Sequence, residues 1–518
     1  MAIIDFFDRG WRINPHGVAY RHGDTSLAFD QAGELSCRIA NALVDTGVGR
    51  ETKAAVLSPN DLLAWICVLG IWRSGAAWVP LNPSHPVSDN VVLLDRFDVE
   101  VLFYAPSVAD QIERMRAELP GITAWIALDE GTGDVALADW VSGHADTRPE
   151  VERDMDDVVA VAPTGGTTGL PKGVMNTHRS FSTMVVHQML ALTYPAGAPI
   201  VNLAAAPMTH TAGLFSLQAT ARGGTTVVID EARADSILDA IERYGVTELF
   251  LPPTVVYRLL ERLEHREADT SSLRYIMYAA APMSLDKLRL GIERLGPVFV
   301  ECYGQMEAPA AITFLRPDEH LIDGATAPDE RLSSCGRPYP LVRVAVLDPS
   351  SGAELAPGST GEICVRGDLL MKGYYKDPER TAQTIVDGWL HTGDLGHLDE
   401  HGYLHLTDRR KDLIISGGFN VYPGEVEQVI WSHPAVQDCA VVGAPHPDWG
   451  EAVTAVVELN PGASADPAEI LALCRERLGP IRTPKDVIFV ARLPRSPNGK
   501  VLKKDVRATF WAGHTTKI

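Results

Sequence analysis

The chain has 518 residues, of which 46% are hydrophobic and 22% charged, and its formal net charge is −21. This length exceeds that of one ordinary domain and the composition is that of a globular protein, so we expect a large unit and a smaller one. The strong negative charge argues against nucleic acid or an anionic membrane as the main partner, although it does not exclude a nucleotide at a locally positive site.

Three features of the sequence concern the compartment of the protein. The longest uncharged apolar run, 62–72, is shorter than the roughly 20 residues that cross a bilayer, so it predicts a buried helix and no membrane span. The N-terminus carries Asp5 early and no basic segment, unlike a secretory signal. The seven cysteines are odd in number and contain no Cys-x-x-Cys pair, which argues against a disulfide framework or a zinc site. We therefore expect a cytoplasmic protein with reduced thiols.

Helical and strand patterns alternate over residues 30–130 and again after residue 200. This alternation predicts mostly parallel sheets covered by helices, arranged as two α/β subdomains that meet at a cleft. The predicted strands are 54–57, 77–81, 158–162, 200–203, 225–229 and 248–251, and the predicted helices include 62–72 and 237–244.

The pattern changes in the last third of the chain. Apolar and polar residues alternate strictly over 341–347 and 361–366, which predicts an antiparallel, β-barrel-like subdomain. The charge run 408–412 is the best domain boundary. We therefore predict an α/β fold with an α+β part: a large N-terminal domain over 1–408 and a small, mobile C-terminal lid domain over 409–518. The lid is predicted to contain strands near 436–442, 453–459 and 487–490 and a helix near 468–478.

A loop rich in threonine and glycine, 164–173, follows the apolar run 158–162. Its glycines let backbone N–H groups approach a ligand, and its hydroxyl groups can donate hydrogen bonds to phosphate oxygens, while Lys172 adds a positive charge. A Walker A loop is excluded, because Leu-Pro separates the last glycine from the lysine. The pattern favours a polyphosphate site, and a flexible surface loop is the alternative.

Seven further segments after the loop contain residues that could belong to a ligand site. Tyr303 can offer a ring face to adenine, and Glu307 can bind Mg²⁺, a hard cation that prefers oxygen ligands. Each segment alone has a commoner structural interpretation, because lone histidines are mostly satisfied loop residues and charge runs or terminal lysines are mostly solvated. The segments are 207–213 with His210, 278–283, 303–307, 389–394 with Asp394, 408–412, 416–423 and 494–500 with Lys500.

In this order the loop and the segments resemble the motifs of the adenylate-forming superfamily, which includes acyl- and aryl-CoA synthetases, nonribosomal-peptide adenylation domains and beetle luciferases. The matches run from residue 73 to residue 500. Gly165 stands where serine is usual and Met306 where threonine or serine is usual, so two hydroxyl groups are missing. The resemblance implies that ATP or AMP is bound by Thr164, Gly165, Gly166, Thr167, Thr168, Gly169, Lys172, Ala280, Ala281, Tyr303, Gly304, Met306, Asp394 and Arg409.

The resemblance also implies the roles of other residues. The implied catalytic residues are Lys500, Glu307, Thr167 and His210, with Glu307 as the Mg²⁺ ligand and Lys411 as the hinge of the lid. The implied acyl pocket consists of His210, Gly213, Tyr257, Ala281 and Met306, and the implied acceptor tunnel passes Gly417 and Gly418.

The implied reaction activates a carboxylic acid with ATP as an acyl-adenylate and transfers it to coenzyme A. Because no acidic residue lies between Pro207 and Gly213 to hold an ammonium group, we expect an aryl, cyclic or medium-chain acid rather than an α-amino acid. The alternatives are transfer to an amine or to a carrier-protein thiol and, from another class, a nucleotide-binding pseudoenzyme. A luciferase is disfavoured, because the C-terminal Thr-Thr-Lys-Ile is not a peroxisomal Ser-Lys-Leu signal. The sequence gives no indication of oligomeric state.

Overall fold

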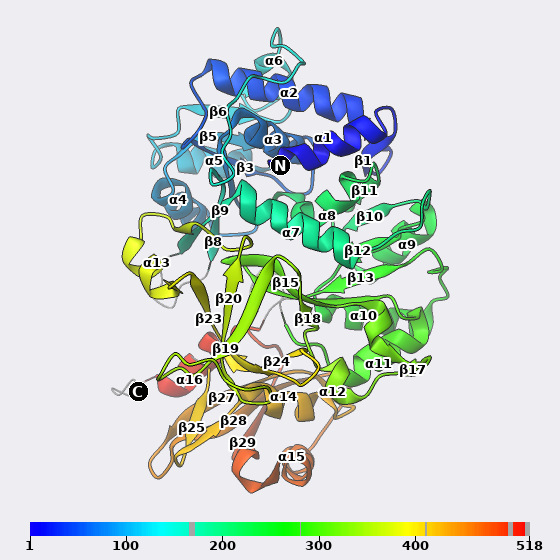
Figure 1. Cartoon of the computed structure of the whole chain (residues 1–518), viewed down its shortest axis with the longest axis vertical. Helices are drawn as coiled ribbons and strands as arrows, with labels where there is room; N and C mark the ends of the chain where they lie inside the picture. Colours follow the sequence, from blue (N-terminus) through cyan, green and yellow to red (C-terminus); the bar gives the residue numbers. More distant parts are fainter. Residues whose placement is uncertain (165–170, 280, 410–411, 496–500, 513–518) are drawn as a thin grey trace.

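The computed structural model describes residues 1–164, 171–279, 281–409, 412–495 and 501–512. Two large sheets with their helices fill the upper part of Figure 1, and the chain beyond residue 412 forms a smaller group of strands and helices at the lower end. This arrangement confirms the predicted α/β fold with a smaller α+β part. No helix within these ranges is long and apolar enough to cross a membrane.

The first large sheet has eight strands in the order β21-β9-β8-β4-β3-β5-β6-β7. The strands from β8 to β7 run parallel, whereas β9 and β21 are antiparallel additions at one edge. Helix α3 begins where the Asp61 side chain accepts hydrogen bonds from two backbone N–H groups, and it ends at Gly75 in a left-handed conformation (φ 86°). The strands are β3 (Lys53–Leu57), β4 (Ala77–Pro80), β5 (Val99–Tyr104), β6 (Ala124–Ala127), β7 (Val135–Ala136), β8 (Val158–Thr164), β9 (Lys172–Thr177) and β21 (Gly373–Tyr374), and the helices are α2 (Phe29–Asp45), α3 (Leu62–Ser74), α4 (Val87–Arg96), η1 (Pro106–Val108), α5 (Ala109–Arg116) and α6 (Leu137–Trp140).

The second large sheet has nine strands in the order β18-β15-β14-β13-β12-β10-β11-β1-β2. Its strands are parallel from β14 to β1 and antiparallel at both edges. Strand β1 comes from the N-terminus and pairs with β11, so that Tyr20 faces Thr226, a pairing that the sequence pattern did not predict. The strands are β1 (Val18–His22), β2 (Thr25–Ala28), β10 (Val201–Ala204), β11 (Thr225–Val228), β12 (Glu248–Phe250), β13 (Tyr275–Tyr278), β14 (Phe299–Gln305), β15 (Ala308–Leu315) and β18 (Arg337–Pro338), and the helices are α1 (Ile4–Ile13), α7 (His178–Ala191), η2 (Met208–Ala212), α8 (Gly213–Thr220), α9 (Ala234–Tyr244), α10 (Pro253–His265) and α11 (Leu285–Leu295).

A third sheet follows in the chain, and it is antiparallel as predicted. Val344 pairs with Val365 in the ladder between β19 and β20, so the predicted apolar positions share one face. Strand β23 lies at the centre, between β20 on one side and β22 and β24 on the other. The elements are β19 (Val342–Leu347), β20 (Gly361–Gly367), β22 (Ile385–Val386), β23 (Trp389–Leu398) and β24 (Leu404–Arg409), with η3 (Pro317–His320), β16 (Leu321–Ile322), β17 (Ala325–Thr326), α12 (Asp329–Leu332) and α13 (Pro378–Thr384) nearby in the chain.

The C-terminal region has its own hydrophobic core. Val426 and Ile430 of one helix and Ile470 of another are fully buried against the apolar face of its sheet. Contacts with the preceding region include the Gln428 side chain, whose Nε2 donates to the backbone oxygen of Met283 at 3.4 Å. The elements are β25 (Ile414–Ser416), β26 (Phe419–Val421), α14 (Pro423–Trp431), β27 (Val436–His446), β28 (Gly450–Leu459), α15 (Pro467–Arg482), β29 (Asp486–Val490) and α16 (Lys503–Trp511).

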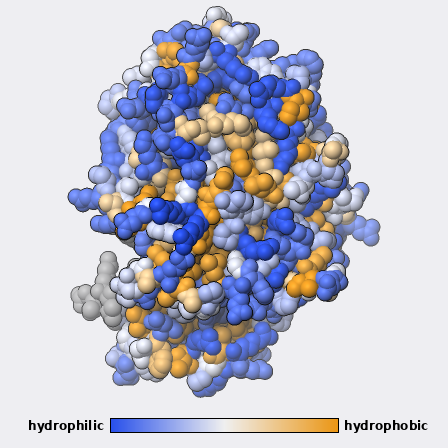
Figure 2. Space-filling model, in the orientation of Figure 1, coloured by the Kyte–Doolittle hydropathy of each residue, from blue (hydrophilic) through white to orange (hydrophobic). Residues whose placement is uncertain are grey.

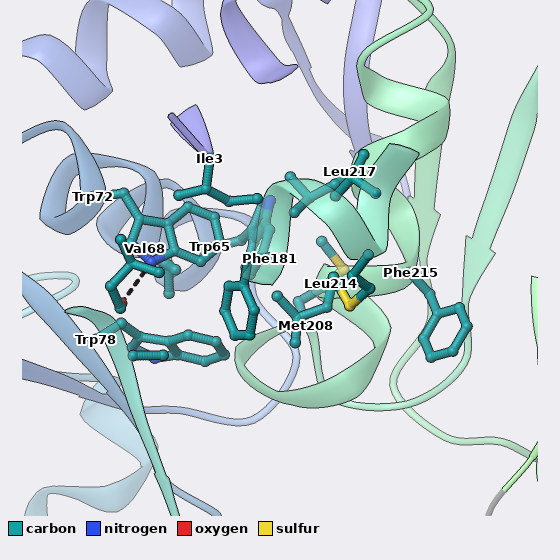
Figure 3. Packing of buried hydrophobic residues seen from close by; sticks show 14 of the residues in the cluster. Ile3, Trp65, Val68, Trp72, Trp78, Phe181, Met208, Leu214, Phe215 and Leu217 are labelled. Atoms are coloured by element: carbon teal, nitrogen blue, oxygen red, sulfur yellow. Dashed lines mark hydrogen bonds between the residues drawn. The ribbon is translucent and has the colours of Figure 1, made fainter. Parts of the chain in front are cut away.

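Three tryptophans join the two large sheets into one core. Trp65 and Trp72 of α3 and Trp78 of β4 meet edge to face, with ring centres 5.6 to 6.4 Å apart. Figure 3 shows Phe181 of α7 and Leu214 of α8 packed beside them, and these helices belong to the other sheet. The indole N–H of Trp65 also donates to the hydroxyl of Tyr20 in β1 at 3.1 Å. The two sheets are therefore held in one fixed arrangement.

The surface is mixed in character. Hydrophilic residues dominate the face shown in Figure 2, and hydrophobic residues form patches in its middle and lower parts. Such patches are ordinary on a globular protein, because there is not enough polar surface to cover it completely.

A buried histidine ties the N-terminus to α7. The backbone N–H of Ile3 donates to Nδ1 of His178 at 3.2 Å, and only 1% of His178 is exposed. This hydrogen bond requires a neutral ring nitrogen as acceptor. Burial, and secondarily the nearby Arg153 charge, lowers the pKa of His178 to about 4. The first helix is thus attached through a group that protonation would disrupt.

We predict that acid weakens this attachment. The pKa of His178 is 6.5 in the unfolded chain and about 4 in the folded one, so the contribution of His178 to the free energy of unfolding should fall as pH drops from 6.5 to 4 and stay level above 7. The contribution is about 1.4 kcal/mol per pH unit in that window. Unfolding by urea at pH 7.5 and pH 5 should show a smaller loss of stability in His178→Gln than in the unsubstituted protein. The exposed control His16→Gln should lose as much as the unsubstituted protein, and equal losses in all three would contradict the assignment.

Candidate functional site

The hairpin β14–β15 lies where the large sheets meet the third sheet. From β14, the hydroxyl of Tyr303 donates to Oδ2 of Asp394 at 2.8 Å, and Nε2 of Gln305 donates to the backbone oxygen of Thr392 at 3.3 Å. Burial, together with the charge of Asp394, keeps the pKa of Tyr303 well above its usual value. The phenol therefore stays protonated and donates, which fixes Tyr303 and Asp394 relative to each other.

Asp394 is held by its own turn. The backbone N–H of Asp394 donates to Oγ1 of Thr392 at 3.1 Å, and the N–H of Gly393, whose φ is 72°, donates to Oε1 of Glu362 at 3.2 Å. The backbone of Arg409 pairs with Asp394 in the ladder between β23 and β24. Two residues that the sequence pattern predicted as nucleotide ligands are thus neighbours, although fifteen positions separate them in the chain.

Glu307 is linked to the threonine- and glycine-rich loop through Tyr374. The hydroxyl of Tyr374 donates to Oε1 of Glu307 at 2.8 Å, and the Nζ atom of Lys172 lies 5.0 Å from the centre of the Tyr374 ring. Lys172 pairs with Thr164 in the β8–β9 ladder, so these two residues flank the mouth of the loop. The buried carboxylate of Glu307 therefore lies near the loop ends.

The packing of the hairpin requires glycine at position 304, a constraint that the sequence did not reveal. A Cβ atom at this position would lie 2.6 Å from the backbone nitrogen of Ala310, and Ala310 itself has a left-handed φ of 46°. The glycine therefore allows β14 and β15 to approach each other across a bulge. Met306 and Glu307 form the turn between these two strands, and the Met306 side chain is partly buried against the core.

The segment after β13 is positioned by a tyrosine. The hydroxyl of Tyr257, on α10, accepts a hydrogen bond from the backbone N–H of Ser284 at 2.7 Å. Ala281 is partly exposed in the same segment, and Met283 next to Ser284 is buried. Tyr257 and Ala281, both predicted in the acyl pocket, thus belong to one local structure.

His210 lies in the irregular turn η2, where its φ of −148° and ψ of −140° interrupt the helix. Its Nδ1 atom lies 2.8 Å from Oγ1 of Thr211, and burial lowers its pKa, so the ring is neutral. The preceding strand end is fixed by Asn60, whose side chain donates to Ile229 O at 2.8 Å and accepts from Met208 N at 2.8 Å. The sequence analysis missed Asn60, since a polar residue after a strand has no distinctive pattern.

Local packing or backbone conformation also explains why glycine stands at Gly213, Gly417 and Gly418. A Cβ atom at Gly213 would lie 2.3 Å from the Trp65 ring, so this glycine makes room for the core. Gly417 and Gly418 have φ values of 58° and 84° between β25 and β26, which a two-residue hairpin turn of the primed type requires. These constraints are compatible with ligand contact but do not depend on it.

Some predicted site residues fall outside the described ranges: Gly165, Gly166, Thr167, Thr168, Gly169, Ala280, Lys411 and Lys500. Of the others, two sets are joined by contacts that start from the β14–β15 hairpin. Tyr303 contacts Asp394, and Glu307 is linked through Tyr374 to Lys172, which pairs with Thr164. His210, Gly213 and Tyr257 lie on η2, α8 and α10, and within the described ranges none of them hydrogen-bonds to those residues.

Known protein families and relatives match this chain over most of its length. The model of the AMP-binding enzyme family matches residues 7–375, and the model of the AMP-binding enzyme C-terminal domain matches residues 425–500. The medium/long-chain-fatty-acid–CoA ligase FadD8 of Mycobacterium tuberculosis is 35% identical over 509 residues, which cover 95% of this chain and 87% of that protein. A feruloyl-CoA synthase of an Amycolatopsis species is 35% identical over 501 residues, which cover 96% and 97%.

A solved structure is similar over the same extent. The amide bond synthetase McbA from Marinactinospora thermotolerans has a TM-score of 0.88 and 33% sequence identity, and the match covers 98% of this chain and 100% of that one. Relatives with different acyl acceptors in their names therefore share this architecture.

We predict that Gly304→Ala damages the hairpin. The added methyl group must displace the Ala310 backbone, at a cost of about 1–3 kcal/mol in the free energy of unfolding. Because Tyr303 and Glu307 flank the substitution, nucleotide affinity should fall with it. Urea unfolding and calorimetric titration with ATP measure the two effects. Gly121→Ala is the matched control, because a Cβ atom at Gly121 would meet nothing within 4 Å. If both variants behave alike, the packing argument is wrong.

Proposed function

The chain belongs to the AMP-binding enzyme family of adenylate-forming ligases, and from this premise we propose how its residues activate a carboxylic acid with ATP and pass the acyl group to coenzyme A. The observation that supports the proposal most strongly is the pair of buried contacts Tyr303–Asp394 and Tyr374–Glu307. Both contacts start from the β14–β15 hairpin: the first reaches Asp394 of the third sheet, and the second reaches Tyr374, which lies next to Lys172 at one end of the threonine- and glycine-rich loop.

The nucleotide would be held from two sides. Tyr303 would present its ring to adenine, while Asp394 would accept hydrogen bonds from the ribose hydroxyls, with Arg409 as its neighbour across the ladder. Thr164 and Lys172 flank the segment whose backbone N–H groups and hydroxyls would contact the phosphates. The fixed Tyr303–Asp394 geometry supports this role, because a preorganised site loses little entropy on binding.

Glu307 is suited to hold Mg²⁺. Its carboxylate is buried, and Oε1 accepts a hydrogen bond from the Tyr374 hydroxyl. The other oxygen can serve as a hard ligand for the cation. When bound with ATP, Mg²⁺ supplies positive charge for the pyrophosphate leaving group. The protein's own contribution is to orient the carboxylate through Tyr374.

In the first step, an oxygen of the substrate carboxylate would attack the α-phosphorus of ATP, and the bond to pyrophosphate would break. The product is a mixed anhydride, in which AMP replaces oxide as the leaving group. Lys500 and the loop, including Thr167, would stabilise the negative charge that develops on the phosphoryl oxygens. Preorganised electrostatic groups of this kind usually provide the largest contribution to catalysis.

In the second step, the thiol of coenzyme A would attack the acyl carbon, and AMP would leave with the electron pair of the broken bond. We propose that residues 409–518 act as a lid that turns about Lys411, which removes Lys500 and brings Gly417 and Gly418 to the acceptor tunnel. The separate core of the C-terminal region supports this division, because a unit with its own core can move without losing its packing.

An amine is the second candidate acceptor. The likeness to an amide bond synthetase at a TM-score of 0.88 favours it, since that protein shares the whole architecture. Two curated relatives named for CoA products, at 35% identity each, favour the thiol. The chemistry of activation is the same for both acceptors.

The acid is proposed to be an aryl, cyclic or medium-chain carboxylate. His210 is neutral because burial lowers its pKa, and the other proposed pocket residues, Gly213, Tyr257, Ala281 and Met306, carry no charge. The pocket would therefore accept an uncharged acyl body. The relative named feruloyl-CoA synthase supports an aryl acid, and the relative named medium/long-chain-fatty-acid–CoA ligase supports an aliphatic one.

The proposed function predicts a specific product pattern. Purified protein with ATP, Mg²⁺ and a library of aryl, cyclic and aliphatic acids should release pyrophosphate with at least one acid. Adding coenzyme A should then yield AMP and a thioester, whereas an amine of the same concentration should yield little amide. Mass spectrometry of the products separates the acceptors. Amide formation faster than thioester formation would show that an amine is the acceptor instead of coenzyme A. Absence of pyrophosphate with every acid would overturn the proposed function.

Lys500→Ala should separate the two half-reactions. Loss of one transition-state donor is expected to slow adenylate formation by about 10²–10³-fold. Thioester formation from supplied acyl-AMP should keep its rate, because Lys500 would be outside the site in that step. Lys504→Ala is the control, as this lysine is exposed and close in sequence. Equal slowing of both half-reactions in Lys500→Ala would contradict the lid rotation.

A further inference from the structure

Three side chains with metal-binding atoms meet on the third sheet. Glu362 and Cys364 are two residues apart on β20, so they share one face, and His391 on β23 is the cross-strand partner of Cys364. One ligand atom from each lies within 4.8 Å of the other two, and this is the one such group of three among the residues that the structure describes. The group is separate from Glu307 and takes no part in the reaction steps above.

Both contacts of His391 converge on one ring nitrogen. Its Nδ1 atom lies 3.1 Å from Oε2 of Glu362 and 3.5 Å from Sγ of Cys364. With a proton on this nitrogen, the N–H donates to the carboxylate and reaches the weakly accepting sulfur only as a shared donor; without a proton, the nitrogen accepts from the thiol and gains nothing from the carboxylate. In either tautomer at least one of the two contacts is therefore weak.

A tetrahedral cation would satisfy both contacts at once. Zinc bonds of about 2.3 Å to sulfur and about 2.0 Å to nitrogen and oxygen place the ligand atoms about 3.5 Å apart for S···N and about 3.3 Å apart for N···O. The corresponding distances here are 3.5 Å and 3.1 Å. The imidazole already has the separations from its two partners that a shared metal ion imposes.

We propose that Glu362, Cys364 and His391 form a binding site for a divalent cation of borderline softness, with Zn²⁺ as the best match. A thiolate, an imidazole and a carboxylate suit Zn²⁺, whereas Mg²⁺ prefers oxygen ligands alone. Cys364 would give up its thiol proton to solvent as the S–metal bond forms. The fourth ligand would be water, because 28% of the His391 side chain is exposed while Glu362 and Cys364 are buried.

The surroundings orient one of the ligands. Oε1 of Glu362 accepts the N–H of Gly393 at 3.2 Å, which leaves Oε2 directed at His391. Hydrogen bonds of this kind, from outside the coordination sphere, fix the direction of a metal ligand. Since Gly393 precedes Asp394, the bound cation would brace the turn that holds the proposed ribose carboxylate. The binding itself does not rest on the proposed function.

Direct binding measurements test the site without any assay of activity. The full-length protein, treated with a chelator and desalted, should bind Zn²⁺ in a calorimetric titration with a stoichiometry of one site. Co²⁺ in place of Zn²⁺ should give the intense near-ultraviolet absorption of a thiolate–cobalt bond. A large excess of Mg²⁺ should leave both signals unchanged. Absence of Zn²⁺ binding, or a Co²⁺ spectrum without the thiolate band, would overturn the proposal.

Variants identify the ligands. Cys364→Ser should abolish the thiolate band, and both it and His391→Gln should weaken Zn²⁺ binding by at least about ten-fold. Cys474→Ser is the matched control, because Cys474 is an equally buried thiol in the C-terminal region. Circular dichroism of each variant checks that it folds. If Cys364→Ser does not fold, Glu362→Gln, which keeps the shape of the side chain, takes its place in the binding measurement. Retention of the band in Cys364→Ser, or its loss in Cys474→Ser, would show that another cysteine binds the metal.

Discussion

The buried hydrogen bond between Tyr303 and Asp394 is the contact on which the rest of the candidate site depends. A phenol and a carboxylate that are both out of water must satisfy each other, since an unpaired buried polar group costs about 1–3 kcal/mol. This requirement fixes β14 of the second large sheet against β23 of the third. The neighbouring contact between Glu307 and Tyr374 does the same for β21 of the first sheet. These two hydrogen bonds thus attach β23 of the third sheet and β21 of the first to the β14–β15 hairpin.

The hydrophobic core divides the molecule into a rigid part and a separable one. Trp65, Trp72 and Trp78 pack with helices of both large sheets, so those sheets share one core and keep one relative position. The region beyond residue 412 buries its apolar residues in cores of its own. The nucleotide site proposed for the first part and the lid movement proposed for the second would suit a ligase with two successive half-reactions.

Several glycines that the family motifs assign to the site have a structural role as well. Gly304 allows two strands to approach, Gly213 makes room for Trp65, and Gly417 with Gly418 forms a tight hairpin turn. A family motif can therefore combine constraints of folding with those of ligand binding. In the proposed metal site, His391 comes from the segment 389–394 and meets Glu362 and Cys364 of the neighbouring strand.

The sequence by itself determined the type and place of most elements, because helical and strand periodicity depends on residues that are close in the chain. It also determined the order of the motifs, and through them the family. The tertiary structure alone decided that β1 enters a sheet beside β11, two hundred positions away, and that Tyr374 contacts Glu307. The same holds for Cys364 and His391, whose spacing gave no sign of a metal site and led us to expect none. These contacts arise from cross-strand pairing and core packing between distant segments, which local patterns do not encode.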